Sequence, residues 1–276
     1  KGWPLDRLLR LPKTFDFELN RAAAINTVRY DPVTAWSWKF YNGGSYGANV
    51  YMRASTLLET LERLLGEPAW SRIMRTYHAR FRYRHPVKDD FVAVVNEVSG
   101  RDLTWFFDRL LEGTEAFDYG VASVSSVEVP ARSRGVHDVD GSRTEMTERK
   151  IAELDEAAAK EPGKAAPPAY RTTVVLRRYG EARLGGDARV EVAVRFKDGS
   201  TETRTWDGQA RWARLEFVGP ARVESAQVDP AGIWLIDENQ ANNSRGADGL
   251  RRNVVKLMGQ AVFALQNLLQ FAASWI

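Results

Sequence analysis

Apolar residues recur at three- and four-residue spacing between residues 50 and 113, which is the period of an amphipathic helix. Gly66 and Gly100 interrupt this period at points where a helix would end. Residues 1–49 are rich in aromatic side chains but keep no sustained period, which is typical of connecting structure. The helical pattern of residues 50–113 predicts a compact antiparallel array of four helices with short loops. These helices are expected at residues 57–65, 67–81, 91–98 and 103–111.

After Tyr119 the period changes from 3.6 to 2, the alternation of half-buried strands. Asp198-Gly199 and Asp207-Gly208 are turn signals of the hairpin type. Several short strands at this spacing favour a small β-sandwich. Residues 131–169 interrupt it as an insertion of charged residues and alanine, with one exposed helix at 145–160. The strands are expected at residues 121–129, 173–178, 189–196, 201–206, 211–217 and 222–228.

Residues 250–276 combine a narrow polar stripe with a wide apolar face, which predicts an amphipathic helix. The polar stripe makes it a poor membrane span, because those groups would need partners inside the bilayer. Three explanations stay open: the helix docks on its own protein, lies at a membrane surface, or forms an oligomer contact. The fold class is therefore α+β, with residues 1–117 as a helical part, 118–236 as a β-sandwich, and 237–276 as a linker and the amphipathic helix.

Charge and composition exclude several classes of protein. The chain carries 39 Lys plus Arg against 36 Asp plus Glu, a net charge of +3 without a concentrated basic face, so nucleic acid is not an expected partner. It has no cysteine, which excludes disulfides, Cys-based metal sites and thiol nucleophiles. None of its three histidines begins a His-Glu-x-x-His pattern, so the common two-histidine zinc helix is absent from this sequence.

The run from Ser45 to Ala54, Ser-Tyr-Gly-Ala-Asn-Val-Tyr-Met-Arg-Ala, continues into a leucine-rich helix that ends in Leu65-Gly66. This run resembles the helix that follows the zinc site in the gluzincin aminopeptidases, the alanyl aminopeptidase and leukotriene hydrolase family. The resemblance covers residues 45–120, because later motifs follow in the same order. They are Tyr77, Phe81, Asp90-Phe91, Val98-Ser99-Gly100, Asp102-Leu103 and Phe106-Phe107.

The resemblance implies roles for two tyrosines. Tyr51 falls on the position whose phenol donates a hydrogen bond to the oxyanion when zinc-activated water attacks the scissile carbonyl, and a phenol is a neutral donor at pH 7. Tyr46 matches a second active-site tyrosine that contacts substrate. The alternative for both is a core tyrosine with a satisfied hydroxyl. Met52-Arg53-Ala54 replaces the family's Glu-Lys-Gly, which keeps a cation but loses a carboxylate and a glycine.

The resemblance also implies that the chain is the C-terminal part of a longer zinc metallopeptidase. The zinc ligands and the general base would lie upstream, so this chain alone should bind no catalytic zinc and be inactive, while the parent would hydrolyse peptides with a free N-terminus. A fibronectin-like β-sandwich commonly follows the catalytic domain in this family. Two alternatives stay open: a non-catalytic peptidase-like scaffold or binding module, and a peptidase-like module of a membrane-associated protein. The compartment is not indicated.

A weaker candidate site lies near the C-terminal end of the strands. Asp237, Asn239, Asn242 and Asn243 faintly resemble a calcium-binding loop. The segment lacks the glycine at the sixth position and the glutamate at the twelfth that such a loop requires. Asx turns and capping are therefore the preferred explanation.

Overall fold

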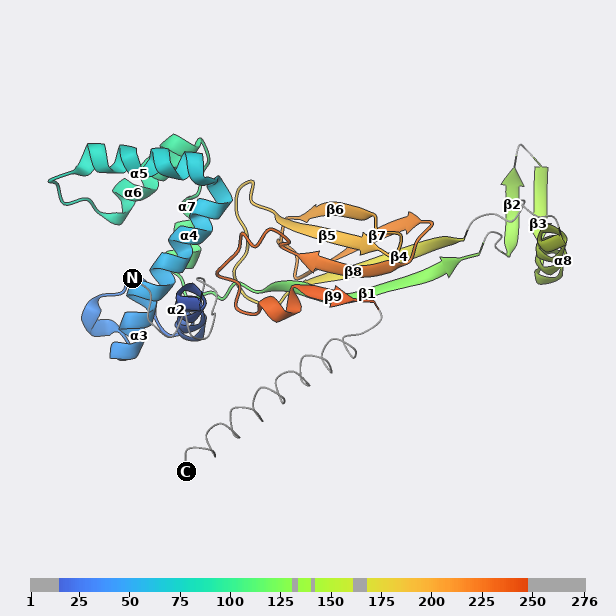
Figure 1. Ribbon diagram of the computed structural model, residues 1–276, viewed down its shortest axis with the longest axis horizontal. Coiled ribbons are helices and arrows are strands. Elements are labelled where there is room, and N and C mark those ends of the chain that lie inside the picture. The colour runs from blue at the N-terminus through green and yellow to red at the C-terminus, as the bar shows by residue number, and fades with distance from the viewer. Residues whose placement is uncertain (1–14, 131–133, 140–141, 161–167, 248–276) are drawn as a thin grey trace, which may run out of the picture.

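The computed structural model describes residues 15–130, 134–139, 142–160 and 168–247 (Figure 1). The amphipathic helix expected at residues 250–276, and with it the proposed contact with a membrane surface, lies outside the described residues. No described helix is long and apolar enough to cross a membrane.

The predicted helices between residues 50 and 113 are confirmed. Leu57 and Leu61 of α4 and Val94 and Val95 of α6 are almost fully enclosed, whereas Leu58 of α4 stays exposed. Gly100 ends α6 in the left-handed conformation that favours glycine. The elements are α4 (Ala54–Leu65), α5 (Glu67–Phe81), α6 (Lys88–Ser99), α7 (Thr104–Phe106) and the π-helical turn η3 (Phe107–Leu111).

Residues 15–49 contain more regular structure than the aromatic-rich sequence indicated. The expectation of connecting structure is wrong for α2 (Phe15–Thr27), a helix of 13 residues. Its position is fixed by Arg21, which is buried and donates to the backbone carbonyls of Leu235 and Asp237. The short elements η1 (Ser37–Lys39), α3 (Gly43–Gly47) and the π-helical η2 (Ala48–Arg53) follow and lead directly into α4.

Two antiparallel sheets follow the helices (Figure 1). The first has the order β1-β4-β7, formed by Tyr119–Val129, Ala169–Arg178 and Trp212–Gly219. The second has the order β6-β5-β8-β9, formed by Thr201–Trp206, Val190–Phe196, Val223–Val228 and Ser244–Gly246. The six strands expected from the period of two are all present. β9 adds a short edge strand within the segment 237–276 that the sequence assigned to a linker and a helix.

The two Asp-Gly signals behave differently. Asp198-Gly199 closes the hairpin between β5 and β6, as predicted. Asp207-Gly208 does not form a hairpin, because β6 and β7 belong to different sheets. Gly208 has φ of +66° and lies against the Tyr119 ring, so this turn carries the chain from one sheet to the other.

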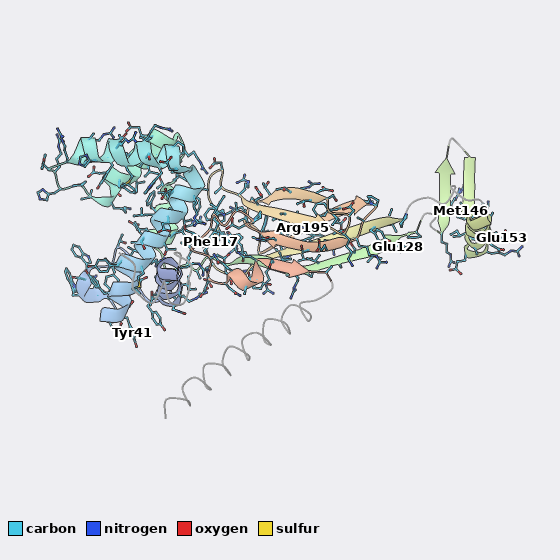
Figure 2. The ribbon with its side chains drawn as sticks, viewed as in Figure 1. Tyr41, Phe117, Glu128, Met146, Glu153 and Arg195 are labelled. Carbon is cyan, nitrogen blue, oxygen red and sulfur yellow. The ribbon has the colours of Figure 1, made fainter. Side chains whose placement is uncertain are left out.

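The insertion between β1 and β4 contains an additional hairpin that the sequence did not predict. β2 (Gly135–Val139) and β3 (Ser142–Met146) pair antiparallel and precede α8 (Glu148–Lys160), the helix expected at residues 145–160. The part that carries Met146 and Glu153 lies beyond the end of the sheets that is farther from the helices (Figure 2).

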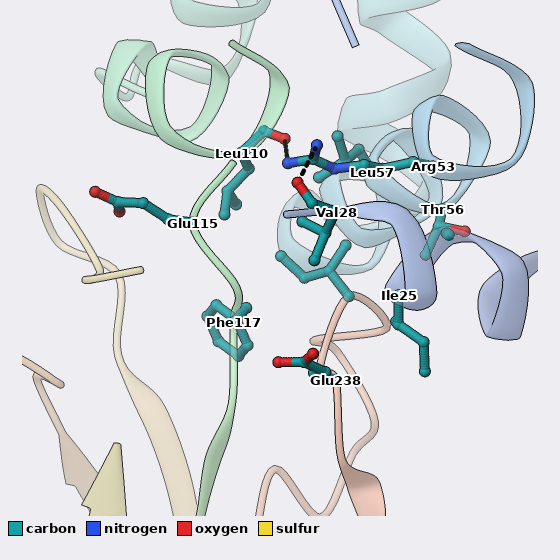
Figure 3. A pocket seen from close by; sticks show the side chains of 11 residues that line it. Ile25, Val28, Arg53, Thr56, Leu57, Leu110, Glu115, Phe117 and Glu238 are labelled. Carbon is teal, nitrogen blue, oxygen red and sulfur yellow. Dashed lines mark hydrogen bonds between the residues drawn. The ribbon is translucent and has the colours of Figure 1, made fainter. Parts of the chain in front are cut away.

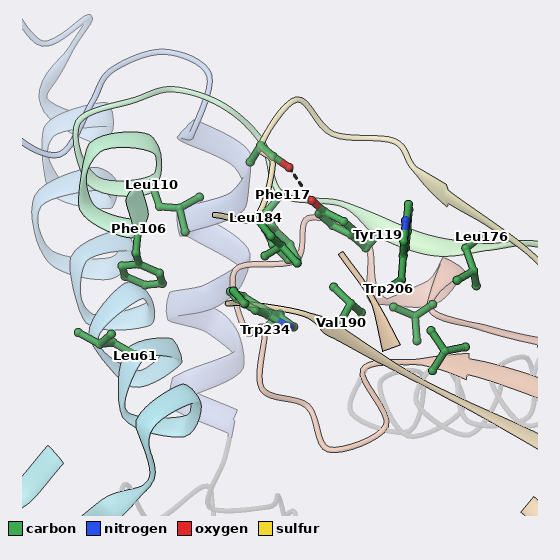
Figure 4. Packing of buried hydrophobic residues seen from close by; sticks show 14 of the residues in the cluster. Leu61, Phe106, Leu110, Phe117, Tyr119, Leu176, Leu184, Val190, Trp206 and Trp234 are labelled. Atoms are coloured by element: carbon green, nitrogen blue, oxygen red, sulfur yellow. Dashed lines mark hydrogen bonds between the residues drawn. The ribbon is translucent and has the colours of Figure 1, made fainter. Parts of the chain in front are cut away.

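One hydrophobic cluster joins the helices to both sheets (Figure 4). Phe106, Phe117 and Trp234 lie at the junction, and the rings of Phe117 and Trp234 stack at a centroid distance of 4.9 Å. Tyr119 continues the cluster into the sheets and donates its hydroxyl proton to the Ala182 carbonyl at 2.9 Å. The shared core means that the helices and the sheets stabilise one another.

Candidate active site

Tyr46 and Tyr51 lie next to each other on the α3–η2 segment. Their ring centroids are 6.2 Å apart and the rings meet edge to face at 82°. In an α-helix, residues five apart would diverge by about 140° around the axis. A π-helical turn bonds residue i to i+5 instead, so it brings residues five apart to one side, and such turns are frequent at functional sites. Tyr51 lies in the π turn over Ala48–Arg53 and Tyr46 lies just before it in α3, so the wider turn between them favours the pairing of the two rings.

The opposite side of the same segment is held by a buried polar network. Ser45 donates through its hydroxyl to the Asp31 carboxylate, which also accepts from the backbone N–H of Tyr41 at 3.0 Å. Asn49 is fully buried and donates its amide to the Ser45 carbonyl at 3.0 Å. Satisfied buried networks of this kind rigidify the backbone that carries them. The network thus fixes the orientation of the helix from which Tyr51 projects.

Arg53 completes the network and is its most buried charge, at 4% exposure. Its two amino groups face five oxygen acceptors and no carboxylate. Burial lowers the pKa of Arg53 to about 10. The residue that the resemblance identified only as a retained cation is therefore a structural clamp between η2 and η3. The acceptors are the carbonyls of Leu110 at 2.7 Å, Gly113 at 2.9 Å, Asp31 at 3.3 Å and Val28 at 3.5 Å, and Asn49 Oδ1 at 3.4 Å.

The two tyrosines differ in their surroundings. Tyr51 is 65% exposed, so its phenol reaches solvent from the side of η2 opposite the network. Tyr46 is half-buried against Phe40, with ring centroids 5.2 Å apart. The Tyr51 hydroxyl, as a hydrogen-bond partner, raises the pKa of Tyr46 above its ordinary value. A phenol is protonated at neutral pH even at its ordinary pKa, so Tyr46 is a neutral hydrogen-bond donor.

The segment before the tyrosine pair exposes two stacked pairs of aromatic side chains. Tyr30 stacks on Tyr41 at 5.5 Å and Trp36 on Trp38 at 5.0 Å, and all four are at least 60% exposed. A hollow of about 340 Å³ beside Tyr46 is lined by Ser37, Phe40, Asn42 and Gly43. The aromatic content of residues 30–46 was the signal for this surface, although the sequence alone indicated only connecting structure.

The donor set near the tyrosines does not fit a zinc ion. Among the residues that the structure describes, no three or more His, Cys, Asp or Glu side chains are placed to share a metal. Asp31 is the carboxylate of the network, and it is occupied by Ser45 and the Tyr41 N–H. His78 and His85 lie near the C-terminal end of α5 and are exposed.

A cavity on the other side of Arg53 is too small to be a substrate site (Figure 3). It holds only about 20 Å³ and its lining is mainly apolar, from Val28, Leu57, Leu110 and Phe117. One water molecule needs roughly 10–15 Å³. The cavity is a packing gap between α2, α4 and the segment that leads into β1.

The loop at Asp237 is held by an Asx turn, as the sequence indicated. Asp237 is 1% exposed, and its carboxylate accepts from the Asn239 N–H at 2.9 Å and the Tyr119 N–H at 3.4 Å. Burial raises the pKa of Asp237 to about 7, and the charge of Asp118 acts in the same direction. The carboxylate therefore links this loop to the first residue of β1.

Comparison with known proteins relates part of the chain to aminopeptidases. No protein-family profile matches the chain. A segment of 65 residues, 24% of the chain, is 34% identical to aminopeptidase N of Lactococcus lactis subsp. lactis and covers 8% of that protein. Aminopeptidase A of Legionella pneumophila, solved in complex with aspartic acid, aligns over 73% of the chain and 19% of its own length, with 9% identity and a TM-score of 0.38. The chain thus spans a small part of both proteins. The sequence similarity supports a family-level relationship of this chain to peptidases.

Proposed function

We propose that this chain is the C-terminal part of a zinc-dependent aminopeptidase-like metallopeptidase that hydrolyses N-terminal peptide bonds. The observation that carries the proposal is the edge-to-face pair of Tyr46 at the end of α3 and Tyr51 on the π-helical turn that follows, combined with the sequence similarity to an aminopeptidase. Residues 1–117 then complete the catalytic domain, and residues 118–236 form a fibronectin-like β-sandwich that follows it.

Tyr51 is proposed to stabilise the oxyanion. Its exposed phenol is a neutral donor directed away from its own protein core. A preorganised donor at a developing oxyanion is worth about 2.7–4 kcal/mol of transition-state stabilisation. The buried network of Asp31, Ser45, Asn49 and Arg53 supplies the preorganisation, because it holds the backbone of η2.

Tyr46 is proposed to contact substrate beside Tyr51. Its phenol is a neutral hydrogen-bond donor, and the adjacent hollow offers room for a substrate side chain. The zinc ion would activate the attacking water when bound by residues outside the described ranges. The substrate would be a peptide with a free N-terminus.

The test is the change of Tyr51 to Phe in the complete gene product that contains this chain, assayed with an amino-acid anilide. We expect kcat to fall by about 100- to 1000-fold with little change in KM, because the lost bond forms mainly in the transition state. Tyr41→Phe is the matched control, since Tyr41 is also exposed and loses one oxygen. Unimpaired kcat/KM in the Tyr51 variant would show that the residue is only structural.

A second assay tests the isolated chain without the rest of the complete gene product. The isolated chain should hold no stoichiometric zinc after dialysis and should not turn over the anilide, since the proposal puts the metal ligands elsewhere. Tight zinc binding with turnover by the chain alone would overturn the proposal that the catalytic metal belongs to a preceding segment.

A non-catalytic peptide-binding module is the alternative. The exposed stacked pairs Tyr30–Tyr41 and Trp36–Trp38 favour it, because exposed aromatic clusters are typical of binding surfaces. This alternative predicts that added peptide quenches the tryptophan fluorescence of the complete protein. It also predicts that the complete protein shows no zinc-dependent turnover. Membrane association through residues 250–276 is a separate proposal, tested by liposome flotation of the intact chain and a chain truncated after residue 249.

A further inference from the structure

A hollow at the junction of the helices and the sheets is lined entirely by charged side chains. Its volume of about 400 Å³ falls in the range of roughly 300–1,000 Å³ found for small-molecule sites. It lies away from Tyr46 and Tyr51, and none of its lining residues belongs to the proposed catalytic machinery. The lining consists of Arg109, Arg178, Arg183, Arg211, Glu115 and Glu181.

Arg178, the last residue of β4, is the buried base of this hollow, at 2% exposure. One of its amino groups donates to the carbonyls of Gly180 at 2.8 Å and Glu181 at 2.9 Å. Its Nε is also buried but has no hydrogen-bond partner in the described part of the chain. A buried donor without an acceptor is unfavourable by about 1–3 kcal/mol, and more for a charged group. Arg178 lines the hollow, so its positive charge adds to the field that an anion bound there would meet.

The other three arginines keep donors free for a ligand. Arg109 of η3 uses one amino group on the Arg183 carbonyl at 3.0 Å. Arg211 is adjacent to Arg178 along the backbone, because its carbonyl accepts from the Arg178 N–H at 2.9 Å. The side chains of Arg183 and Arg211 form no ion pair within the described ranges.

The two glutamates do not neutralise the hollow. Four arginines and two glutamates leave the lining with a formal charge of 4 − 2 = +2. Glu181 is already paired with Arg29 at 2.9 Å and accepts from the Ala116 N–H at 3.3 Å. The positive field also reaches Tyr119: burial raises the pKa of Tyr119 to about 12, against the opposing effect of the charges of Arg178 and Arg109.

We propose that this arginine hollow binds a small molecule through a phosphate or carboxylate group. Guanidinium groups match both groups because they donate two parallel N–H bonds to two oxygens. The bound group would bridge η3 of the helical part to β4 and the segment before β7. Binding should therefore stabilise the junction between the helices and the sheets, because a ligand that binds only the folded state raises its stability.

The test measures thermal melts of the chain in inorganic phosphate or in succinate, with sodium chloride at equal ionic strength as the reference. We expect at least one anion to raise Tm saturably. The variant Arg183→Gln/Arg211→Gln should raise the apparent Kd by about tenfold or more, because both changes remove exposed donors that have no other partner in the described part of the chain. Protection by phosphate alone would assign a phosphate group, and protection by succinate alone would assign a carboxylate.

The matched control is Arg171→Gln/Arg195→Gln, which removes the same charge from β4 and β5. Arg171 lies seven residues before Arg178 on β4, and Arg195 lies on β5 within the sheets (Figure 2). The control should bind like the original chain. The proposal is overturned if neither anion raises Tm above the chloride reference, if the rise is linear with concentration and never saturates, or if both double variants respond like the original chain. These outcomes need no peptidase activity, so they do not depend on the proposed function.

Discussion

Changing Asp237 to Asn tests the electrostatics of the junction between the sheets and the helices. The side chain is 1% exposed, and its carboxylate accepts backbone N–H groups of Asn239 and Tyr119. Burial raises the pKa to about 7 against an ordinary 3.8, although the bond from Asn239 lowers it. The negative charge of Asp118 adds to the rise. The charged groups nearby are Asp118, Glu238 and Arg29, together with Arg21, which contacts the Asp237 backbone carbonyl.

The sign of the effect follows from proton linkage. Below about pH 4 both the folded and the unfolded chain hold this proton, so Asp237 contributes no pH dependence. Between about pH 4 and 7 the folded chain keeps a proton that the unfolded chain releases, so the free energy of unfolding falls as pH rises, by up to about 1.4 kcal/mol per unit. The pKa difference of 7 − 3.8 = 3.2 units corresponds to a total loss of about 4 kcal/mol.

Urea unfolding between about pH 4.5 and 8.5 measures this slope in the original chain and in Asp237→Asn. We expect the original chain to lose stability across this range relative to the variant, because the amide does not titrate. Only the slope is diagnostic, since the amide NH₂ faces backbone donors and lowers stability at every pH. Asp108→Asn is the control, because Asp108 is exposed and its removal should leave the slope unchanged. An identical slope in the original chain and Asp237→Asn would refute the assignment of a raised pKa.

Two further predictions concern packing, and urea unfolding checks both. Arg53→Met should lower the free energy of unfolding by about 2–4 kcal/mol, because two backbone carbonyls lose short hydrogen bonds. Removing the buried charge offsets part of this loss. An unchanged free energy of unfolding would contradict the role of Arg53 as a clamp. Gly208→Ala should lower it by about 2–4 kcal/mol, since the new Cβ would lie 2.6 Å from the Tyr119 ring at φ of +66°. Gly199→Ala is the control for Gly208→Ala, because φ is +88° at Gly199 but nothing lies within 4 Å of the new Cβ. We expect a smaller loss of about 1–2 kcal/mol in this control. Equal losses in the two variants would argue against the contact with the Tyr119 ring.

The helices between residues 54 and 111 were predictable because each carries its own apolar stripe, and Gly66 and Gly100 mark the ends of two of them. α2 was not, because its alanines and polar residues give no clear stripe. Its place in the fold depends on Arg21, whose acceptors at Leu235 and Asp237 are more than 200 residues away. No local pattern reports such a contact.

The strands were predictable from alternation, whereas their connections were not. Asp198-Gly199 and Asp207-Gly208 are the same dipeptide, and each offers the φ > 0 position that a tight turn needs. The first closes a hairpin and the second crosses between sheets, because Gly208 packs on Tyr119, a residue 89 positions earlier. The turn type follows from this distant ring and not from the dipeptide.

The candidate site, too, was only partly predictable from the sequence. The resemblance singled out Tyr46 and Tyr51 from adjacent sequence, but the network beneath them includes partners as far as 60 residues apart. The arginine hollow is less visible still, because its arginines come from four different segments and share no motif. The aromatic residues of 30–46 were noticed as composition, but only the fold shows that they pair in stacks and stay exposed.

The two most buried arginines of the chain's described core illustrate how structural and ligand-binding roles differ. Arg53 and Arg178 are both at least 96% enclosed, and both donate to backbone carbonyls and not to carboxylates. Arg53 meets five oxygens, so its guanidinium is satisfied by the fold itself. Arg178 leaves Nε without an acceptor and lines an open hollow with three more arginines. Burial alone would assign both residues to the scaffold, so it is the arginines around Arg178 in the hollow that favour a ligand there.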